Sequence, residues 1–373
     1  MSPARPATGL AGFLQRNLSL LYAAGVLGAF LQISGGTWDV ASHSLGIPDT
    51  FFTPSHSILY AGVGIAALAG LGGIVLRMTA FRASPAGRTL VAGLGISFVG
   101  SLLQGIAGPA DFAWHEAFGF DPFLFTPSHS LLIAGIILVG VGMAVGSARL
   151  LRAREAGVDV GRSLGSRAAL RAIVLVSLSV LWLDLNALVY ILTDVQGMAY
   201  TFRLGDAFVD RYEWVNFAIA PVALALTGTL VLLAAKRVVG GTRGVSAVAI
   251  LAAAVVGLGN VAFRASYLEA TPEGAAIARF IPLYVAFLIP VVFFDLALPD
   301  HAGRRRTLVA AALVAPFASF LDGWHGTFLW TAGRDLLPLY VAPMVLMGLV
   351  AGLLSARFTE ALLARERPIV AAA

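Results

Sequence analysis

Cysteine is absent from this 373-residue chain, and charged side chains are scarce. Without thiols the chain forms no disulfide and no thiolate metal or redox site, so a metal site must be built from His, Asp, Glu or Asn. Charged residues make up only 12% of the chain, whereas a soluble domain carries about 25%. Hydrophobic residues make up 58%, and the mean hydropathy is +0.86. This composition excludes an ordinary water-soluble protein and predicts one that is embedded in membrane lipid.

Long apolar runs set the expected fold. A transmembrane helix needs about 20 mostly apolar residues, and the 41 glycines of the chain allow such helices to approach one another closely. We therefore predict an all-α fold, a polytopic integral membrane helical bundle of about ten transmembrane helices built as repeated helical hairpins. The predicted helices cover 18–37, 54–76, 89–108, 127–148, 168–190, 214–235, 245–263, 280–298, 307–322 and 338–356.

The basic residues are divided unevenly between alternate loops. Most of the 25 Lys and Arg residues fall in one set of segments, and the other set carries most of the acids. The basic set comprises the two termini and the segments 77–88, 149–171, 236–243 and 304–306. By the positive-inside rule both termini are cytoplasmic, which predicts a multi-pass protein of the cytoplasmic membrane. Membrane lipid, and not nucleic acid, is therefore the expected partner of this basic chain, and a homo-oligomer stays open.

The first two predicted hairpins repeat one pattern. Residues 35–62 read GGTWDVASHSLGIPDTFFTPSHSILYAG, and residues 108–135 read GPADFAWHEAFGFDPFLFTPSHSLLIAG. Both place an Asp and a His at the end of one helix and the phrase F-T-P-S-H-S at the start of the next. Such self-similarity indicates one structural unit used twice. We therefore expect 1–150 to contain two metal-binding hairpins and 151–373 to form additional transmembrane hairpins that lack the pattern.

Each repeat offers one carboxylate and two imidazoles. Asp39 and His43 are four residues apart, which places them on one helix face, one turn from each other. His56 falls in the first turn of the next helix, because Thr53 is a good N-cap and Pro54 suits the first helical position. A tight hairpin brings the end of one helix beside the start of the next, so the three side chains are expected to converge.

The second repeat offers the equivalent triad of Asp111, His115 and His129. Two imidazoles and one carboxylate give a divalent metal ion three ligands and leave coordination positions open. Zinc, iron and copper all accept this set, and the spacing does not choose between them. Ionisable residues at a membrane helix end can be simple interfacial residues, but at membrane depth they tend to be functional. Glu116 is a weaker candidate that would orient a ligand or move protons, with a solvated loop acid as the alternative.

The two spacings resemble those of a known membrane subunit. Asp39-x3-His43-x12-His56 and Asp111-x3-His115-x13-His129 are similar to the two metal sites in the C subunit of the copper membrane monooxygenases, the particulate methane and ammonia monooxygenase family. In that family the second site begins with Asn, where this chain has Asp111. The resemblance covers about residues 30–140. It implies copper as the metal, dioxygen as the oxidant, and A- and B-type monooxygenase subunits as partners.

Three functions fit the sequence. The first is a copper-dependent monooxygenase, or its metal-binding C-type subunit, that oxidises a small substrate such as a hydrocarbon or ammonia. The second is a membrane-embedded zinc hydrolase that uses the same triads, with Glu116 as the general base. The third is a metal transport or metal-binding membrane protein. A transporter favours ligands near the membrane midplane, whereas these triads are expected at helix ends toward the outer face, so transport ranks last.

Overall fold

A computed structural model describes most of the chain, and all of the regular structure that it describes is helical. The described residues are 9–44, 50–78, 85–119, 123–161, 163–212, 214–240, 243–255, 281–299, 302–320 and 337–363. The labelled helices are α1 (Gly9–Arg16), α2 (Leu18–Ser44), α3 (Pro54–Met78), α4 (Pro85–Phe118), α5 (Pro127–Glu155), α6 (Arg167–Thr193), α7 (Val195–Phe202), α8 (Asp206–Tyr212), α9 (Trp214–Val239), α12 (Ile281–Ala297), α13 (Arg304–Phe320) and α15 (Leu337–Leu363). A further short helix covers Gly244–Val255.

Seven of the described helices are long and apolar enough to cross a membrane: α2, α3, α4, α5, α6, α9 and α15. This confirms the prediction of an all-helical protein that spans a membrane. The helix Gly244–Val255 and helices α12 and α13 also fall on predicted apolar runs, but they are shorter. The count of ten spans and the cytoplasmic placement of both termini stay predictions.

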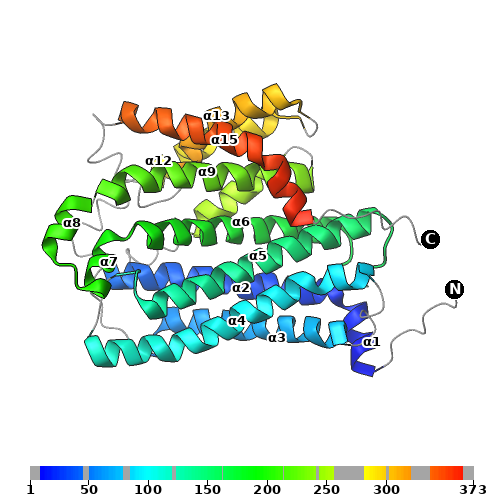
Figure 1. Ribbon diagram of the computed structural model, residues 1–373. Helices are drawn as coiled ribbons and strands as arrows, with labels where there is room; N and C mark the ends of the chain where they lie inside the picture. The colour runs from blue at the N-terminus through cyan, green and yellow to red at the C-terminus, as the bar shows by residue number, and fades with distance from the viewer. Residues whose placement is uncertain are drawn as a thin grey trace.

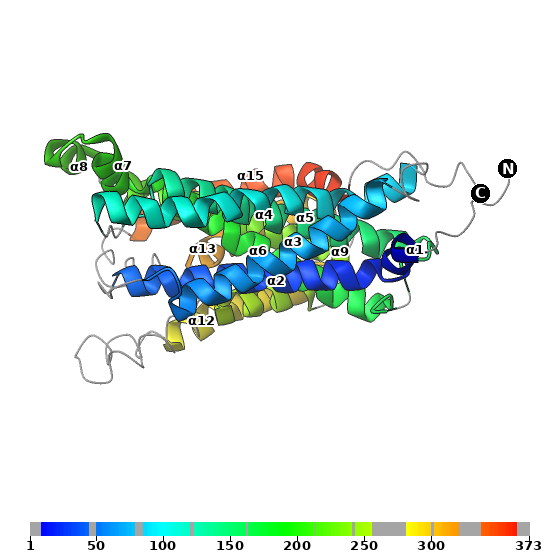
Figure 2. The ribbon, with the colours of Figure 1, turned by 90° about the horizontal axis from the view of Figure 1, so that it is seen from below.

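The long helices lie lengthwise beside one another (Figure 1). The end of α4 and the start of α5 lie at the same end of the bundle as α7 and α8, and α1 lies at the opposite end, in both views (Figures 1 and 2). Helix α2 packs mainly on α3, and α4 packs mainly on α5. The two hairpins of the sequence repeat are therefore two antiparallel helix pairs, joined by the contact between α3 and α4.

Glycines let the two helices of each pair touch through their backbones. A Cβ atom added to Gly62 of α3 would lie 2.6 Å from the carbonyl oxygen of Gly28 in α2. One added to Gly135 of α5 would lie 2.7 Å from the carbonyl oxygen of Gly100 in α4. Membrane helices associate through such close packing, because lipid provides no hydrophobic force between them. The same contact in both pairs shows that the sequence repeat is also a repeat of packing.

Several helix ends differ from the sequence-based prediction. Helix α5 continues to Glu155 and α6 begins at Arg167, so the basic connection is shorter than 149–171. Helix α9 reaches Val239, so Lys236 lies inside a helix and not in a loop. Its ammonium group is buried and lies 3.1 Å from a carboxylate oxygen of Asp295 in α12. An apolar run predicts which residues lie within the hydrocarbon layer. Helix caps and packing determine where the helix itself ends.

Candidate metal centre

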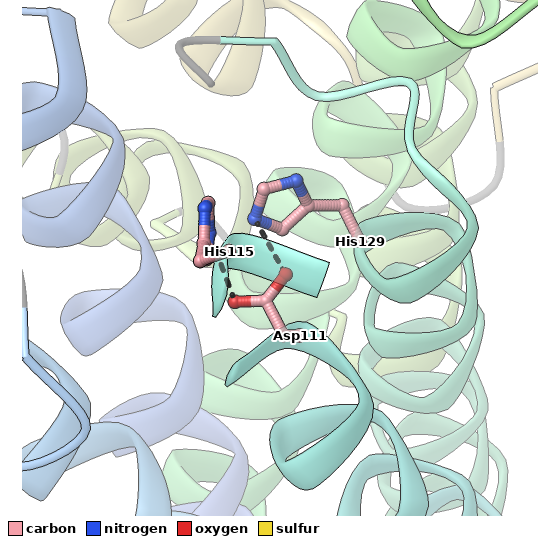
Figure 3. Close-up of side chains that lie close together, drawn as sticks. All are labelled: Asp111, His115 and His129. Atoms are coloured by element: carbon pink, nitrogen blue, oxygen red, sulfur yellow. Dashed lines mark ion pairs between the residues drawn. The ribbon is translucent and has the colours of Figure 1, made fainter. Parts of the chain in front are cut away.

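The triad of the second repeat comes together in the structure. Asp111 and His115 lie one turn apart near the end of α4, and His129 lies in the first turn of α5 (Figure 3). The Asp111 carboxylate points between the two rings, with His115 Nε2 3.5 Å from Oδ2 and His129 Nε2 3.4 Å from Oδ1. One ligand atom from each of the three residues can be chosen so that all lie within 4.8 Å of one another.

Local sequence explains why His129 reaches the centre. Thr126 has extended backbone angles and caps α5, accepting a hydrogen bond from the backbone N–H of His129 at 3.3 Å. Pro127 occupies the first helical turn, where its missing N–H costs nothing. The capped helix therefore starts at a fixed residue, and the His129 ring projects from its first turn toward α4. The predicted cap and proline start are confirmed for this helix.

The backbone determines which nitrogen of each imidazole faces the carboxylate. His129 Nδ1 lies 3.1 Å from the carbonyl oxygen of Phe123, and His115 Nδ1 lies 3.3 Å from that of Gly119. A carbonyl oxygen only accepts hydrogen bonds, so each Nδ1 carries the hydrogen and donates it. In the neutral ring Nε2 then holds a lone pair that faces the carboxylate. Two acceptors that face each other need a cation between them, either a proton or a metal ion.

A serine holds the carboxylate from its other side. Ser128 Oγ donates to Asp111 Oδ1 at 2.7 Å, and both residues are buried. In the first repeat Ser55 Oγ donates to Asp39 Oδ1 at 3.0 Å. Groups that orient metal ligands in this way are important for affinity. The sequence analysis missed both serines, although their place in each F-T-P-S-H-S phrase was a signal that could have found them.

The first repeat forms part of an equivalent arrangement. His56 Nε2 lies 3.2 Å from Asp39 Oδ1, and His56 Nδ1 donates to the carbonyl oxygen of Thr50 at 3.0 Å. This is the arrangement found at Asp111 and His129. The backbone of His43 belongs to α2, but its side chain lies outside the described part of the structure. The structure therefore brings together two residues of the first predicted triad, and its third ligand stays a prediction.

Asp194, at the junction of α6 and α7, forms hydrogen bonds to the loop before α5. Its Oδ2 accepts hydrogen bonds from the backbone N–H groups of Leu124 and Phe125, at 2.8 and 2.9 Å. Its Oδ1 accepts from Gly197 N at 2.8 Å and so caps α7. This loop also contains Phe123, the carbonyl partner of His129. No signal in the sequence linked Asp194 to the centre, because it lies far along the chain from both ligand-bearing helices.

The three side chains of the triad are partly exposed to solvent. The side chains of Asp111 and His129 are 13% and 9% exposed, and that of His115 is 21% exposed. Glu116 is exposed on the next position of α4, and no hydrogen bond within the described residues joins it to the triad. The arrangement therefore provides three side chains that could bind a metal ion, of which His115 is the most exposed. Comparisons with protein-family models, curated proteins and solved structures give no match for this chain.

Proposed function

We propose that this chain is a membrane metalloprotein that binds copper at two similar centres and acts as a monooxygenase, or as the metal-binding C-type subunit of one. The observation that supports this most is the convergence of Asp111, His115 and His129 at the junction of α4 and α5. The repeat of the carboxylate, the imidazole and the orienting serine at Asp39, His56 and Ser55 supports a second centre.

The separations at Asp111 are close to those around a bound metal ion. Ligand atoms about 2.1 Å from a four-coordinate ion lie roughly 3.4 Å apart. His129 Nε2 lies 3.4 Å from one carboxylate oxygen and His115 Nε2 lies 3.5 Å from the other, and one ligand atom from each residue lies within 4.8 Å of the other two. Asp111, His115 and His129 would hold the ion at the second centre, and Asp39, His43 and His56 at the first. Bound copper would supply one-electron chemistry toward dioxygen.

The protein's own groups have separate tasks in this proposal. The Phe123 and Gly119 carbonyl groups bind Nδ1 of each imidazole and so direct Nε2 toward the ion, and Ser128 orients the carboxylate. Phe112 and Phe118 of α4 are 48% and 54% exposed. These rings lie within one turn of the ligands and would let a small apolar substrate reach the centre from the lipid.

The proposal also includes a location and partners. The centre lies at the end of α4, away from the basic segments that the positive-inside rule assigns to the cytoplasm. We therefore place both centres toward the outer face of the cytoplasmic membrane. A- and B-type subunits are the partners that the resemblance implies, because the family assembles its oxygenase from three kinds of chain.

Metal analysis combined with electron paramagnetic resonance tests the proposal. The full chain, purified without added metal, is expected to contain copper with a signal typical of nitrogen ligands. His129→Ala should lose the copper of the second centre and keep that of the first, whereas the matched variant Ser130→Ala should retain both. Stoichiometric zinc in place of copper would overturn the oxygenase proposal in favour of a zinc hydrolase. Protein that binds neither metal would overturn the metal centres themselves.

A further inference from the structure

The helices that carry the carboxylates share a longer motif than the metal triads. Helix α2 reads Gln32-x3-Gly36-x2-Asp39-x3-His43, and α4 repeats the same residues at the same spacing from Gln104 to His115. Positions separated by three, four or seven residues lie on one helix face. The glutamine, the glycine and the carboxylate of each helix therefore lie along one face, with the glutamine two turns deeper in the bundle.

The two glutamines meet between α2 and α4. Gln104 Nε2 donates to Gln32 Oε1 at 2.9 Å, and the two side chains are 3% and 0% exposed. The stem of each glutamine packs on the glycine of its own hairpin partner. A Cβ atom on Gly135 would lie 2.6 Å from Gln104 Cγ, and one on Gly62 would lie 3.0 Å from Gln32 Cγ. Both hairpins thus hold a glutamine in the same way and direct it at the other.

The pair leaves one donor and one acceptor unused. Two side-chain amides can form two mutual hydrogen bonds, but these form one, so Gln32 Nε2 and Gln104 Oε1 have no partner among the described residues. The buried hydroxyl groups of Ser97 and Ser101, on the same face of α4, also have none among those residues. A buried polar group without a partner costs about 1–3 kcal/mol. Water satisfies both kinds of group, because it donates and accepts.

A glycine lies between this polar pair and the carboxylate on each helix. A Cβ atom on Gly36 would meet nothing within 4 Å, and the nearest neighbour of one on Gly108 would be the Tyr60 side chain, at 3.6 Å. Asp111 lies seven positions after Gln104, which corresponds to a rise of about 10.5 Å along the helix. About two or three waters at the usual hydrogen-bond spacing of ~2.8 Å would cover that gap.

We propose that Gln32 and Gln104 form a shared water-binding site between the two hairpins, and that water held along the Gly36 and Gly108 faces connects this site to both carboxylates. A buried water needs two to four polar partners, and we assign this role to the amide N–H of Gln32, the amide oxygen of Gln104 and the hydroxyl group of Ser101, which are buried without a partner among the described residues. The inference does not depend on which metal the centres hold, nor on whether they hold one.

A structure of the full chain in a lipid nanodisc, at a resolution that shows ordered water, tests this site. Density for water is expected within hydrogen-bond distance of both amides and again beside Gly36. The double variant Gln32→Leu with Gln104→Leu should lose the first density. Two mutual hydrogen bonds between the amides, with no water beside them in the wild-type protein, would overturn the proposal.

Radiolytic labelling with isotopically marked water gives a second readout that does not need the double variant to fold. Side chains beside bound water take up oxygen from it, so Leu59 of α3, which is buried against Gly35 of α2, should be labelled in the wild-type protein. Gly36→Leu fills the open space and should abolish this labelling. Gly64→Leu is the matched control, since a Cβ atom on Gly64 also meets nothing within 4 Å. Equal labelling in the two variants would exclude a water path along Gly36.

Discussion

Metal binding at the second candidate centre would depend on how its carboxylate is held between the imidazoles. At the second centre Asp111 Oδ1 accepts a hydrogen bond from Ser128 and also lies nearest to His129 Nε2. Removing a group that orients a metal ligand typically lowers metal affinity by about 10- to 100-fold. The serine is buried with the carboxylate, so water does not readily replace it.

We expect Ser128→Ala to weaken metal binding at the second centre by about 10- to 100-fold, while the fold is retained. Competition titration with a metal chelator measures this affinity in the purified protein. Ser130→Ala removes a hydroxyl group from the same helix turn without touching the triad and should leave the affinity unchanged. Equal affinities in the two variants would show that Ser128 does not orient the carboxylate.

The residues of the second triad could be predicted from the sequence, whereas the partners of the groups that hold them in place could not. Asp111 and His115 are four residues apart, and this spacing alone places them on one helix face. His129 follows a recognisable cap. Ser128 was marked by its place in the repeated phrase, but its partner could not be assigned, because a serine in a membrane helix serves many hydrogen-bonding roles. Asp194 could not be assigned either, since only the fold brings the end of α6 to the loop before α5.

At the scale of elements, the α6–α7 junction fixes the loop that leads into α5. Asp194→Ala removes the cap of α7, which costs about 1 kcal/mol, and releases the backbone N–H groups of Leu124 and Phe125. The loop should then hold His129 less firmly. We expect lower thermal stability and weaker metal binding at the second centre, with the first centre unaffected.

Metal titration with the two centres resolved by spectroscopy checks this expectation for Asp194→Ala. Asp206→Ala is the control, because Asp206 is an exposed acid in the first turn of α8. A loss of affinity at both centres would indicate general unfolding and not a local effect on the loop.

The glycine contacts within each hairpin give a separate prediction about stability. Gly62→Ala would force a Cβ atom against the Gly28 carbonyl oxygen, and overpacking of this kind costs about 1–3 kcal/mol. Gly64→Ala, two residues further along α3, meets open space and should gain up to about 1 kcal/mol, since alanine favours the helix. Thermal unfolding of both variants in detergent should shift the midpoint in opposite directions. A shift of both midpoints in the same direction would contradict the packing between α2 and α3.

Helix positions could be predicted more closely than helix ends. The apolar runs located α2 to α6 because lipid selects about 20 consecutive apolar residues. Helix α4 nevertheless continues to Phe118, past the predicted end at 108, and so carries Asp111 and His115 on a regular helix. Polar residues do not end a helix by themselves. The partial burial of this turn against α5 stabilises a helical segment that hydropathy does not mark.

For the whole molecule, orientation in the membrane decides from which side the centres are reached. The chain contains no cysteine, so a single introduced cysteine can be labelled with a thiol reagent without first removing native ones. Glu116 lies exposed beside the second centre, and Ala156 lies exposed after α5 in a basic connection. If the basic segments are cytoplasmic, these two positions face opposite sides of the membrane.

We therefore expect Glu116→Cys to react with a membrane-impermeant maleimide in intact cells, and Ala156→Cys to react only after the membrane is opened. Both positions are exposed helix-end residues, so a difference in labelling reports the side of the membrane and not burial. The reverse pattern would place the centres on the cytoplasmic side, where substrate and reductant would reach them from the cell interior. Labelling of both positions in intact cells would mean that α5 does not cross the membrane, and the two hairpins could not then span the bilayer as antiparallel pairs.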